Sequence, residues 1–246
     1  MSPITLYSMK TLELTNDYRI HHFLKERSNA FVVESSDQLY VVDSGRQNDV
    51  ETVLQSIVDL QAETEKNAHW LILTHTHYDH SGGAAMLKKE LGLKVVVGKA
   101  EVRFLKNGFT PLPEGTNLFT DWVSDLGRQM SGKGFDYPPV RAYKALSHEW
   151  AVDPAIRVIL TPGHTQGSMS VIVNDEVAIV GDTLSGLDPS HVLPPYADDI
   201  NELLKSWGLL LATPCHSFLP GHGNVIKRAE LDEEYNKFVS FKTEKE

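Results

Sequence analysis

Apolar and polar positions along the first part of the chain alternate as they do in antiparallel strands. Within 18–43, the segments 30–34 (AFVVE) and 39–42 (LYVV) are the clearest examples. Residues 49–60 then place apolar side chains at helical spacing, and the apolar run 70–74 (WLILT) predicts a short buried strand. Small residues open the next segment, 81–90, which predicts a helix that ends before Gly92.

The second half of the chain repeats this scheme of strands followed by a helix. Strands are expected near 156–161, 169–174 and 176–181, followed by a helix near 198–212. A strand up to Leu219 and a last helix from about residue 227 complete the pattern. Strand-rich segments followed by a helix, twice over, favour a duplicated sandwich over a doubly wound parallel sheet.

Candidate chemistry is concentrated in the run 75–80 (HTHYDH), directly after the predicted strand 70–74. An extended backbone points residues i and i+2 to the same side, so His75 and His77 can bind one ion. The following turn brings Asp79 and His80 toward a neighbouring position. Imidazole and carboxylate groups are ligands of zinc and of its first-row neighbours, so this run predicts a metal site.

Three further candidates, His164, Asp182 and His222, each follow an apolar run and lie beside glycine. Strand ends next to glycine-containing loops are places where a rigid scaffold presents functional groups. A lone His-x-His pair would favour a solvated loop with histidines clustered by accident. Because three further candidate ligands lie at similar strand ends, we do not favour that interpretation.

Together these residues resemble the metal-binding signature of the metallo-β-lactamase superfamily, from Asp43 to His222 and in the family's order. The resemblance implies an α+β fold, an αβ/βα four-layer sandwich with two sheets face to face, helices outside and a dinuclear site along one edge. It assigns the ligands as His75, His77 and His164 for one metal, Asp79, His80 and His222 for the other, and Asp182 as the bridge. Asp43 matches the family's strand-end aspartate, which orients a ligand histidine without binding metal itself.

The implied cofactors are two divalent ions, zinc by expectation, with iron and manganese as alternatives. The implied chemistry is hydrolysis, in which a metal-bridging hydroxide attacks an ester-type bond. Asp79 and Asp182 are then the predicted catalytic carboxylates, and no Ser/His/Asp or Cys/His relay is needed. Substitution of a primary ligand is expected to abolish activity.

Length and composition restrict the remaining possibilities. With 246 residues, 41% of them hydrophobic, 1–246 is expected to form a single domain. The sequence has no run of about 20 apolar residues and no apparent secretory signal, so we expect a cytoplasmic protein without a membrane span. The single cysteine, Cys215, excludes an internal disulfide. A net charge of −10 argues against nucleic-acid partners. A small-molecule substrate is expected, and the oligomeric state stays open.

Two segments are candidates for the walls of a substrate pocket. Residues 99–150 depart from the sandwich pattern and contain aromatic residues among Gly and Pro, with helical spacing from 120 to 130. We interpret this range as a substrate-covering insertion with Phe119 and Trp122 in the pocket; the alternative is a cluster that packs on itself. The loop 187–196 is the second candidate. There Tyr196 or His191 could orient substrate or donate a proton, and a solvated proline-rich loop is the alternative.

Differences between this chain and individual branches of the family narrow the range of expected substrates. Asp182 stands where β-lactamases of the superfamily have Cys or Ser, which argues against antibiotic hydrolysis as the main task. The full ligand set looks most like the glyoxalase II and lactonase branches, so a thioester or a lactone is the expected substrate. However, residues 223–246 are too short for the helical domain of classical glyoxalase II, and Ser185 stands where lactonases commonly have Tyr. The alternatives are a mononuclear-iron oxidoreductase resembling persulfide dioxygenases, a phosphodiester hydrolase, and a catalytically silent metal-bound module.

Overall fold

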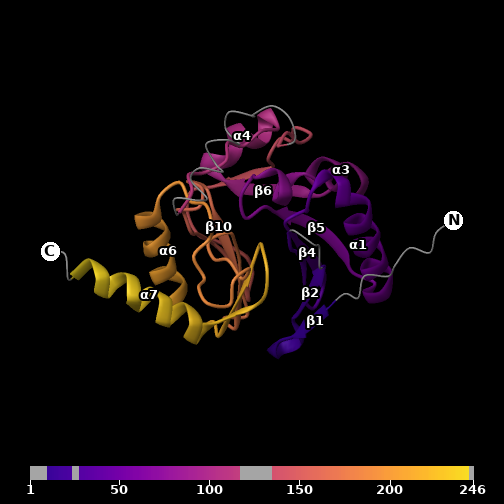
Figure 1. Ribbon diagram of the computed structural model, residues 1–246. Helices are drawn as coiled ribbons and strands as arrows, with labels where there is room; N and C mark the ends of the chain where they lie inside the picture. Colours follow the sequence, from indigo (N-terminus) through magenta and orange to yellow (C-terminus); the bar gives the residue numbers. More distant parts are fainter. Residues whose placement is uncertain (1–9, 24–27, 117–134, 244–246) are drawn as a thin grey trace.

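The strands of the computed structural model, which describes residues 10–23, 28–116 and 135–243, form two sheets (Figure 1). The first sheet follows chain order: β1 Lys10–Glu13, β2 Arg19–Phe23, β3 Ala30–Glu34, β4 Gln38–Val42, β5 Asn67–Ile72, β6 Lys94–Gly98 and β7 Lys144–Leu146. The second has the order β13-β12-β11-β10-β9-β8, with β8 Trp150–Asp153, β9 Ile156–Leu160, β10 Met169–Val173, β11 Val177–Gly181, β12 Ser217–Pro220 and β13 Ile226–Lys227.

Helices cover the outer faces of the two sheets. Figure 1 shows α1 and α3 on one side of the molecule and α6 and α7 on the other. The α-helices in the described residues are α1 Val50–Thr64, α2 Tyr78–Ser81, α3 Ala84–Leu91, α4 Val102–Asn107, α6 Ile200–Ala212 and α7 Arg228–Thr243. Three short 3₁₀ helices also lie there: η1 Thr15–Asp17, η2 Gln47–Asp49 and η3 Lys99–Glu101.

In the described part of the chain, three buried apolar clusters separate the layers. The first contains Ile57 of α1 together with Val32 and Val41 of the first sheet. In the second, Phe31 and Val33 of the first sheet share a cluster with side chains of the second sheet. Trp207 of α6 belongs to the third, which covers the other face of the second sheet. Because alternate residues of β3 belong to different clusters, this strand is buried on both faces, and the four-layer α+β sandwich predicted from the sequence is confirmed.

The direction of the strands brings several loops to one edge of the sandwich. β4, β5, β6 and β7 run parallel to one another, and β11 runs parallel to β12. The carboxyl ends of neighbouring parallel strands meet at the same edge, where open α/β sheets commonly bind their ligands. The loops after β5, β9, β11 and β12, together with α2, carry the predicted metal ligands.

The predicted elements that lie in the described residues are observed with some shifted boundaries, and the structure adds elements that were not predicted, among them β1, β6, β8 and α4. The helix expected over 81–90 is divided into α2 and α3, and Gly82 lies at the junction. A β-carbon on Gly82 would lie 2.4 Å from the carbonyl oxygen of Tyr78 and 2.5 Å from the amide nitrogen of Gln47. Only glycine fits this close approach between α2 and η2.

The range 99–150, interpreted as an insertion, contains parts of the sandwich itself. β7 pairs with β6, and Leu105 of α4 lies in the same buried cluster as Tyr137 and Val140. Phe119, Trp122 and the helical pattern over 120–130 lie outside the described residues. None of the helices described by the structure is long and apolar enough to cross a membrane.

Candidate metal centre

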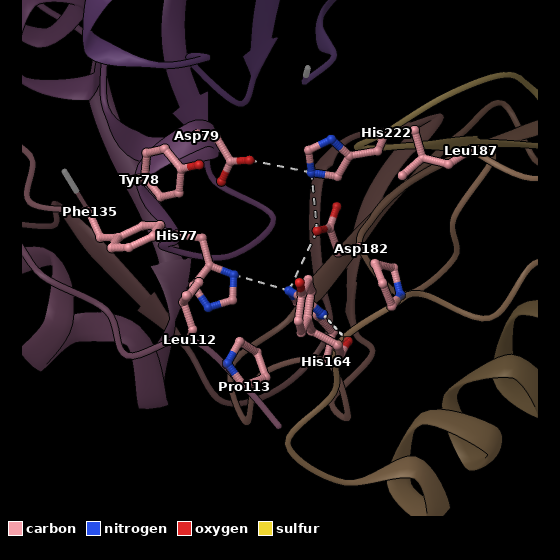
Figure 2. A pocket seen from close by; sticks show the side chains of 12 residues that line it. His77, Tyr78, Asp79, Leu112, Pro113, Phe135, His164, Asp182, Leu187 and His222 are labelled. Carbon is pink, nitrogen blue, oxygen red and sulfur yellow. Dashed lines mark hydrogen bonds and ion pairs between the residues drawn. The ribbon is translucent and has the colours of Figure 1, made fainter. Parts of the chain in front are cut away.

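The side chains of all seven predicted ligands come together at the edge of the sandwich (Figure 2 labels five of them). They form three overlapping groups, and within each group the ligand atoms lie within 4.8 Å of one another. These groups are His75, His77 and His164; Asp79, His80 and His222; and His75, His80 and Asp182. The first two groups coincide with the two ligand sets assigned from the sequence.

Each ligand comes from a strand end or from the short helix α2. His75 and His77 lie in the loop after β5, whereas Asp79 and His80 belong to α2. The second half of the chain supplies the other three from the loops that follow β9, β11 and β12. The centre therefore lies between the two halves of the sandwich.

Hydrogen bonds to backbone carbonyls fix the orientation and tautomer of two histidines. His77 donates through Nε2 to the Pro111 carbonyl at 3.2 Å, and His164 donates through Nδ1 to the Tyr196 carbonyl at 2.8 Å. A carbonyl oxygen can only accept, so in the neutral rings the other nitrogens carry lone pairs. These nitrogens, Nδ1 of His77 and Nε2 of His164, face each other at 3.0 Å. Two facing lone pairs repel unless a cation lies beside them.

Asp43 has the same orienting role toward His80. One carboxylate oxygen of Asp43 lies 2.9 Å from Nδ1 of His80 and 2.8 Å from the Thr74 hydroxyl, and the other accepts from the Thr74 amide at 2.7 Å. Because Nδ1 of His80 donates to this carboxylate, Nε2 of His80 points toward the other ligands. This contact is the one expected for an aspartate that orients a metal-binding histidine.

Two buried polar atoms of the cluster have no hydrogen-bond partner among the residues that the structure describes. They are Nε2 of His75 and Oδ1 of Asp182. Buried polar atoms in proteins are usually hydrogen-bonded or coordinated, so atoms left without a partner need an explanation. Coordination of a cation would satisfy both.

Asp182 lies between the two ligand sets. Its Oδ1 is 3.4 Å from Nε2 of His80, while its Oδ2 is 3.5 Å from Nε2 of His164 and 3.3 Å from Nε2 of His222. Although burial opposes ionisation, the histidines His222, His80 and His164 lower the pKa of Asp182 well below its usual range. The carboxylate is therefore ionised and available to both sets.

The electrostatic environment differs between the two sides of the cluster. Burial lowers the pKa of His75, His77 and His164, so these imidazoles are neutral and able to coordinate. At His80 burial acts in the same direction, but Asp182, Asp43 and Asp79 raise the pKa to about 10. Asp182 likewise raises the pKa of His222 against the effect of burial. The carboxylate-rich side thus favours a positive charge, which a metal ion can provide in place of protons.

Imidazole and carboxylate donors in this arrangement fit divalent ions of the zinc and first-row type. The facing lone-pair nitrogens of His77 and His164 and the unpartnered atoms of His75 and Asp182 support the fit.

The single cysteine, Cys215, takes no part in the centre, because it is buried in the apolar cluster between α6 and the second sheet.

Glu101 connects the two ligand loops, a role that no pattern in the sequence indicated. The side chain is fully buried. Its Oε2 accepts from the amide of Thr76, at 3.1 Å, and from the Thr76 hydroxyl, while its Oε1 accepts from the amide of Gly167 at 3.2 Å. Thr76 lies between His75 and His77, and Gly167 follows His164 by three residues. The burial of Glu101 and its contacts with both loops cannot be inferred from the sequence, because they form only in the folded chain.

Asn29 has a related role at the loop of His222. Its side-chain amide donates to the carbonyls of Pro220, at 3.0 Å, and Gly223, at 3.1 Å, and its backbone amide donates to the carbonyl of Gly221 at 2.7 Å. Asn29 precedes β3 in the first half of the chain, so this contact also joins the two halves.

A cavity of about 310 Å³ opens over the cluster. The ligands His77, Asp79, His164, Asp182 and His222 line it, and so does Tyr196. His191, the other proposed orienting residue, lines a neighbouring cavity instead. Its side chain is half exposed and lies 3.4 Å from the carboxylate of Asp188.

Comparison with known proteins shows the family and the fold of the chain. The family model described as the metallo-beta-lactamase superfamily matches residues 25–222. Among solved structures, a B3 metallo-beta-lactamase named BLEG-1 superposes with a TM-score of 0.64, at 17% sequence identity, covering 92% of this chain and 96% of that one. At this identity the likeness shows the shared fold.

Three curated relatives have names that indicate hydrolytic or lactamase-like proteins. A beta-lactamase-like protein 2 homolog of Drosophila melanogaster is 26% identical over 201 residues, covering 81% of this chain and 60% of that protein. An atrochrysone carboxyl ACP thioesterase of Aspergillus fumigatus is 25% identical over 206 residues, covering 82% and 53% respectively. A hydroxyacylglutathione hydrolase of Acidiphilium cryptum is 29% identical over 162 residues, covering 66% and 53%.

The chain thus spans between half and two thirds of the length of these three relatives. The family model covers most of the chain, and the matched region contains every predicted ligand. The protein belongs to the metallo-β-lactamase superfamily.

Proposed function

We propose that this protein is a dinuclear metal-dependent hydrolase that cleaves an ester-type bond, with a thioester as the first candidate substrate and a lactone as the second. The observation that carries the proposal is the complete set of seven histidine and aspartate side chains, five of which line one cavity. The overlap of the ligand groups and the position of Asp182 between them support two ions over one.

Divalent ions held by these residues would supply Lewis acidity toward a carbonyl oxygen and a water of lowered pKa. The chain itself supplies the carboxylates of Asp79 and Asp182, both of which line the cavity. Asp182 stays ionised because the surrounding histidines lower its pKa. Oδ2 of Asp79 lies 3.5 Å from Nε2 of His222 within the second ligand set, and this carboxylate faces the cavity, where it is placed to accept a proton from a reacting group.

Tyr196 adds a neutral donor on the cavity wall. Burial raises the pKa of its phenol, so the hydroxyl is protonated at neutral pH. A protonated phenol can donate a hydrogen bond to a substrate oxygen, and the Tyr196 carbonyl at the same time orients His164. Tyr196 is therefore proposed to orient substrate.

The preference for a thioester comes from the relatives. One is named as an acyl-carrier-protein thioesterase, and another as a hydrolase of hydroxyacylglutathione, which is a thioester. Both names concern those proteins, and their identity to this chain is below 30%. Asp182 in place of Cys or Ser continues to argue against β-lactam hydrolysis as the main activity.

The test is a hydrolysis assay on a panel of a thioester, a lactone, a phosphodiester and a β-lactam. The protein is assayed as purified, after chelation, and after zinc, manganese or iron is returned. We expect hydrolysis of the thioester or the lactone, loss after chelation and recovery with a divalent ion. Hydrolysis of the phosphodiester alone would overturn the choice of bond. One iron per chain with oxygen uptake would instead support the mononuclear-iron oxidoreductase.

A further inference from the structure

The described walls of the cavity above the cluster are largely apolar. On the side of His77 they comprise Tyr78, Leu112, Pro113 and Phe135, and Leu187 lies near His222 (Figure 2). Pro195 continues the wall next to Tyr196. The polar atoms are concentrated at the base, where the ligand histidines and aspartates lie.

These walls are held in place by contacts among themselves. The rings of Tyr78 and Phe135 meet edge to face with centroids 5.1 Å apart, and Tyr78 directly precedes the ligand Asp79. The segment carrying Leu112 and Pro113 is also joined to the opposite wall. The amide of Thr116 donates to the Pro195 carbonyl at 3.0 Å, and the amide of Ala197 donates to the Glu114 carbonyl at 2.9 Å.

No described side chain lining this cavity is a lysine or an arginine. The guanidinium of Arg46 lies 5.4 Å from the centroid of the Tyr78 ring but does not line the cavity. A negatively charged substituent placed among these described side chains would lose hydration without gaining a cationic partner from them. An uncharged apolar substituent would instead gain from burial there.

We propose that the cavity is a subsite for an uncharged, apolar acyl group whose carbonyl lies over the metal centre. This inference rests on the proposed function, since the acyl group must be attached to the bond that is cleaved. The apolar acyl part of the substrate is then the part that the enzyme recognises. At about 310 Å³ the cavity is at the lower end of ligand pockets, roughly 300–1,000 Å³, so acyl groups of intermediate length should fit best.

The first experiment measures kcat/KM for straight-chain acyl thioesters of one thiol, from acetyl to decanoyl. We expect an increase of about fourfold per methylene, the factor that corresponds to ~0.8 kcal/mol per buried methylene, until the cavity is filled. Glutaryl thioester, which has the length of pentanoyl but ends in a carboxylate, is expected to be at least tenfold poorer than pentanoyl. Equal rates for acetyl, pentanoyl and glutaryl would overturn the subsite.

The second experiment changes the charge of the wall. Leu112→Lys places an ammonium group among the apolar residues and should lower kcat/KM for pentanoyl while raising that for glutaryl, a change of at least tenfold in their ratio. Leu209→Lys is the matched control, because Leu209 is 52% exposed on α6 and does not line this cavity. The control should leave the ratio unchanged. Unchanged preference in Leu112→Lys, with metal content and folding intact, would contradict the proposal.

The proposed function and the proposed subsite fail in different ways. If no thioester or lactone of any length is hydrolysed by the metal-loaded protein, the proposed function fails. If thioesters are hydrolysed without regard to the length or charge of the acyl group, the proposed function survives and the apolar subsite fails.

Discussion

Glu101 is a buried carboxylate that holds the loops of the metal centre without belonging to the ligand set. It accepts hydrogen bonds from Thr76 in the first loop and from Gly167 in the second. Ligand orientation by such outer contacts commonly affects metal affinity by about 10- to 100-fold. We expect Glu101 to act as a positioning residue.

Glu101→Gln tests this role. The amide has one accepting oxygen where the carboxylate has two, so the contact with one loop must be lost. We expect metal affinity, measured by competition with a chelator, to fall by about 10-fold or more. Glu90→Gln is the control, since Glu90 is exposed on α3 and pairs with Lys89. Equal metal affinities of Glu101→Gln and the wild-type protein would exclude the positioning role.

The site residues that could be predicted from the sequence are those that directly follow a recognisable strand. His75, His164 and His222 each follow an apolar run, so their place at one edge of the sandwich could be inferred. Glu101 could not, because a lone glutamate at the start of a helix looks like a solvated charge. Its burial depends on the close approach of Gly98 to Gly167, which are far apart in sequence.

The loop of His164 packs closely against α6. Gly163 has a φ of +137°, and a β-carbon there would lie 2.3 Å from the backbone nitrogen and Cα of Leu203. The Gly163 carbonyl also accepts from the amide of Asp199, the residue that caps α6. Substitution at Gly163 therefore affects the loop and the helix together.

Gly163→Ala should lower the free energy of unfolding by clearly more than Gly92→Ala, as measured by urea denaturation. Gly92 also has a positive φ, +69°, but a β-carbon added there would have no atom within 4 Å, so only the backbone strain of ~1–2 kcal/mol applies. Gly163→Ala adds a backbone collision and should also lose bound metal. Equal destabilisation by the two substitutions would show that the contact with α6 is unimportant.

A buried ion-pair cluster links β2, β3 and the residue before β5. The carboxylate of Glu34 on β3 accepts from Lys66 at 2.7 Å and pairs with His21 on β2 at 2.8 Å. Although burial opposes ionisation, Lys66 and His21 hold the pKa of Glu34 below its ordinary value. The resulting stabilisation is complete above the pKa of the unfolded chain and is lost as the pH falls through the lower folded pKa.

Glu34→Gln should reduce the free energy of unfolding at pH 7 by about 1–3 kcal/mol. The difference from the wild-type protein should shrink as the pH is lowered below about 4.3, the ordinary pKa of glutamate. Urea denaturation at a series of pH values measures both effects. Glu13→Gln is the control, because the Glu13–Arg19 pair is exposed and should contribute little to stability. A difference that grows on acidification would contradict the assignment.

At the level of elements, the periodicity of apolar residues predicted the positions of strands and helices well where the apolar positions form a clear pattern. It located α1, β3, β4 and the second-half strands. It was less informative for 99–150, because α4 and β7 are short and their burial depends on distant partners. The break between α2 and α3 likewise depends on contact with η2, which lies about thirty residues earlier in the chain.

For the whole molecule, the metal centre is a joint product of the two halves. The loop after β5 and the helix α2 supply four ligands, and the second half supplies His164, Asp182 and His222. Asn29 and Glu101, both from the first half, hold loops of the second half in place. The family resemblance predicted the ligand set and the layered fold. The resemblance did not predict the apolar cavity. Six of its lining residues lie in the segments 99–150 and 187–196, which the sequence analysis proposed as candidate pocket walls.

The central claim is that these seven residues hold two metal ions with Asp182 shared between them. It is tested most directly by the metal content per chain, measured by elemental analysis and native mass spectrometry, for the wild-type protein and for Asp182→Ala. We predict two divalent ions in the wild-type protein and the loss of at least one in the variant, together with loss of hydrolysis. Two ions and full turnover retained in Asp182→Ala would contradict this claim.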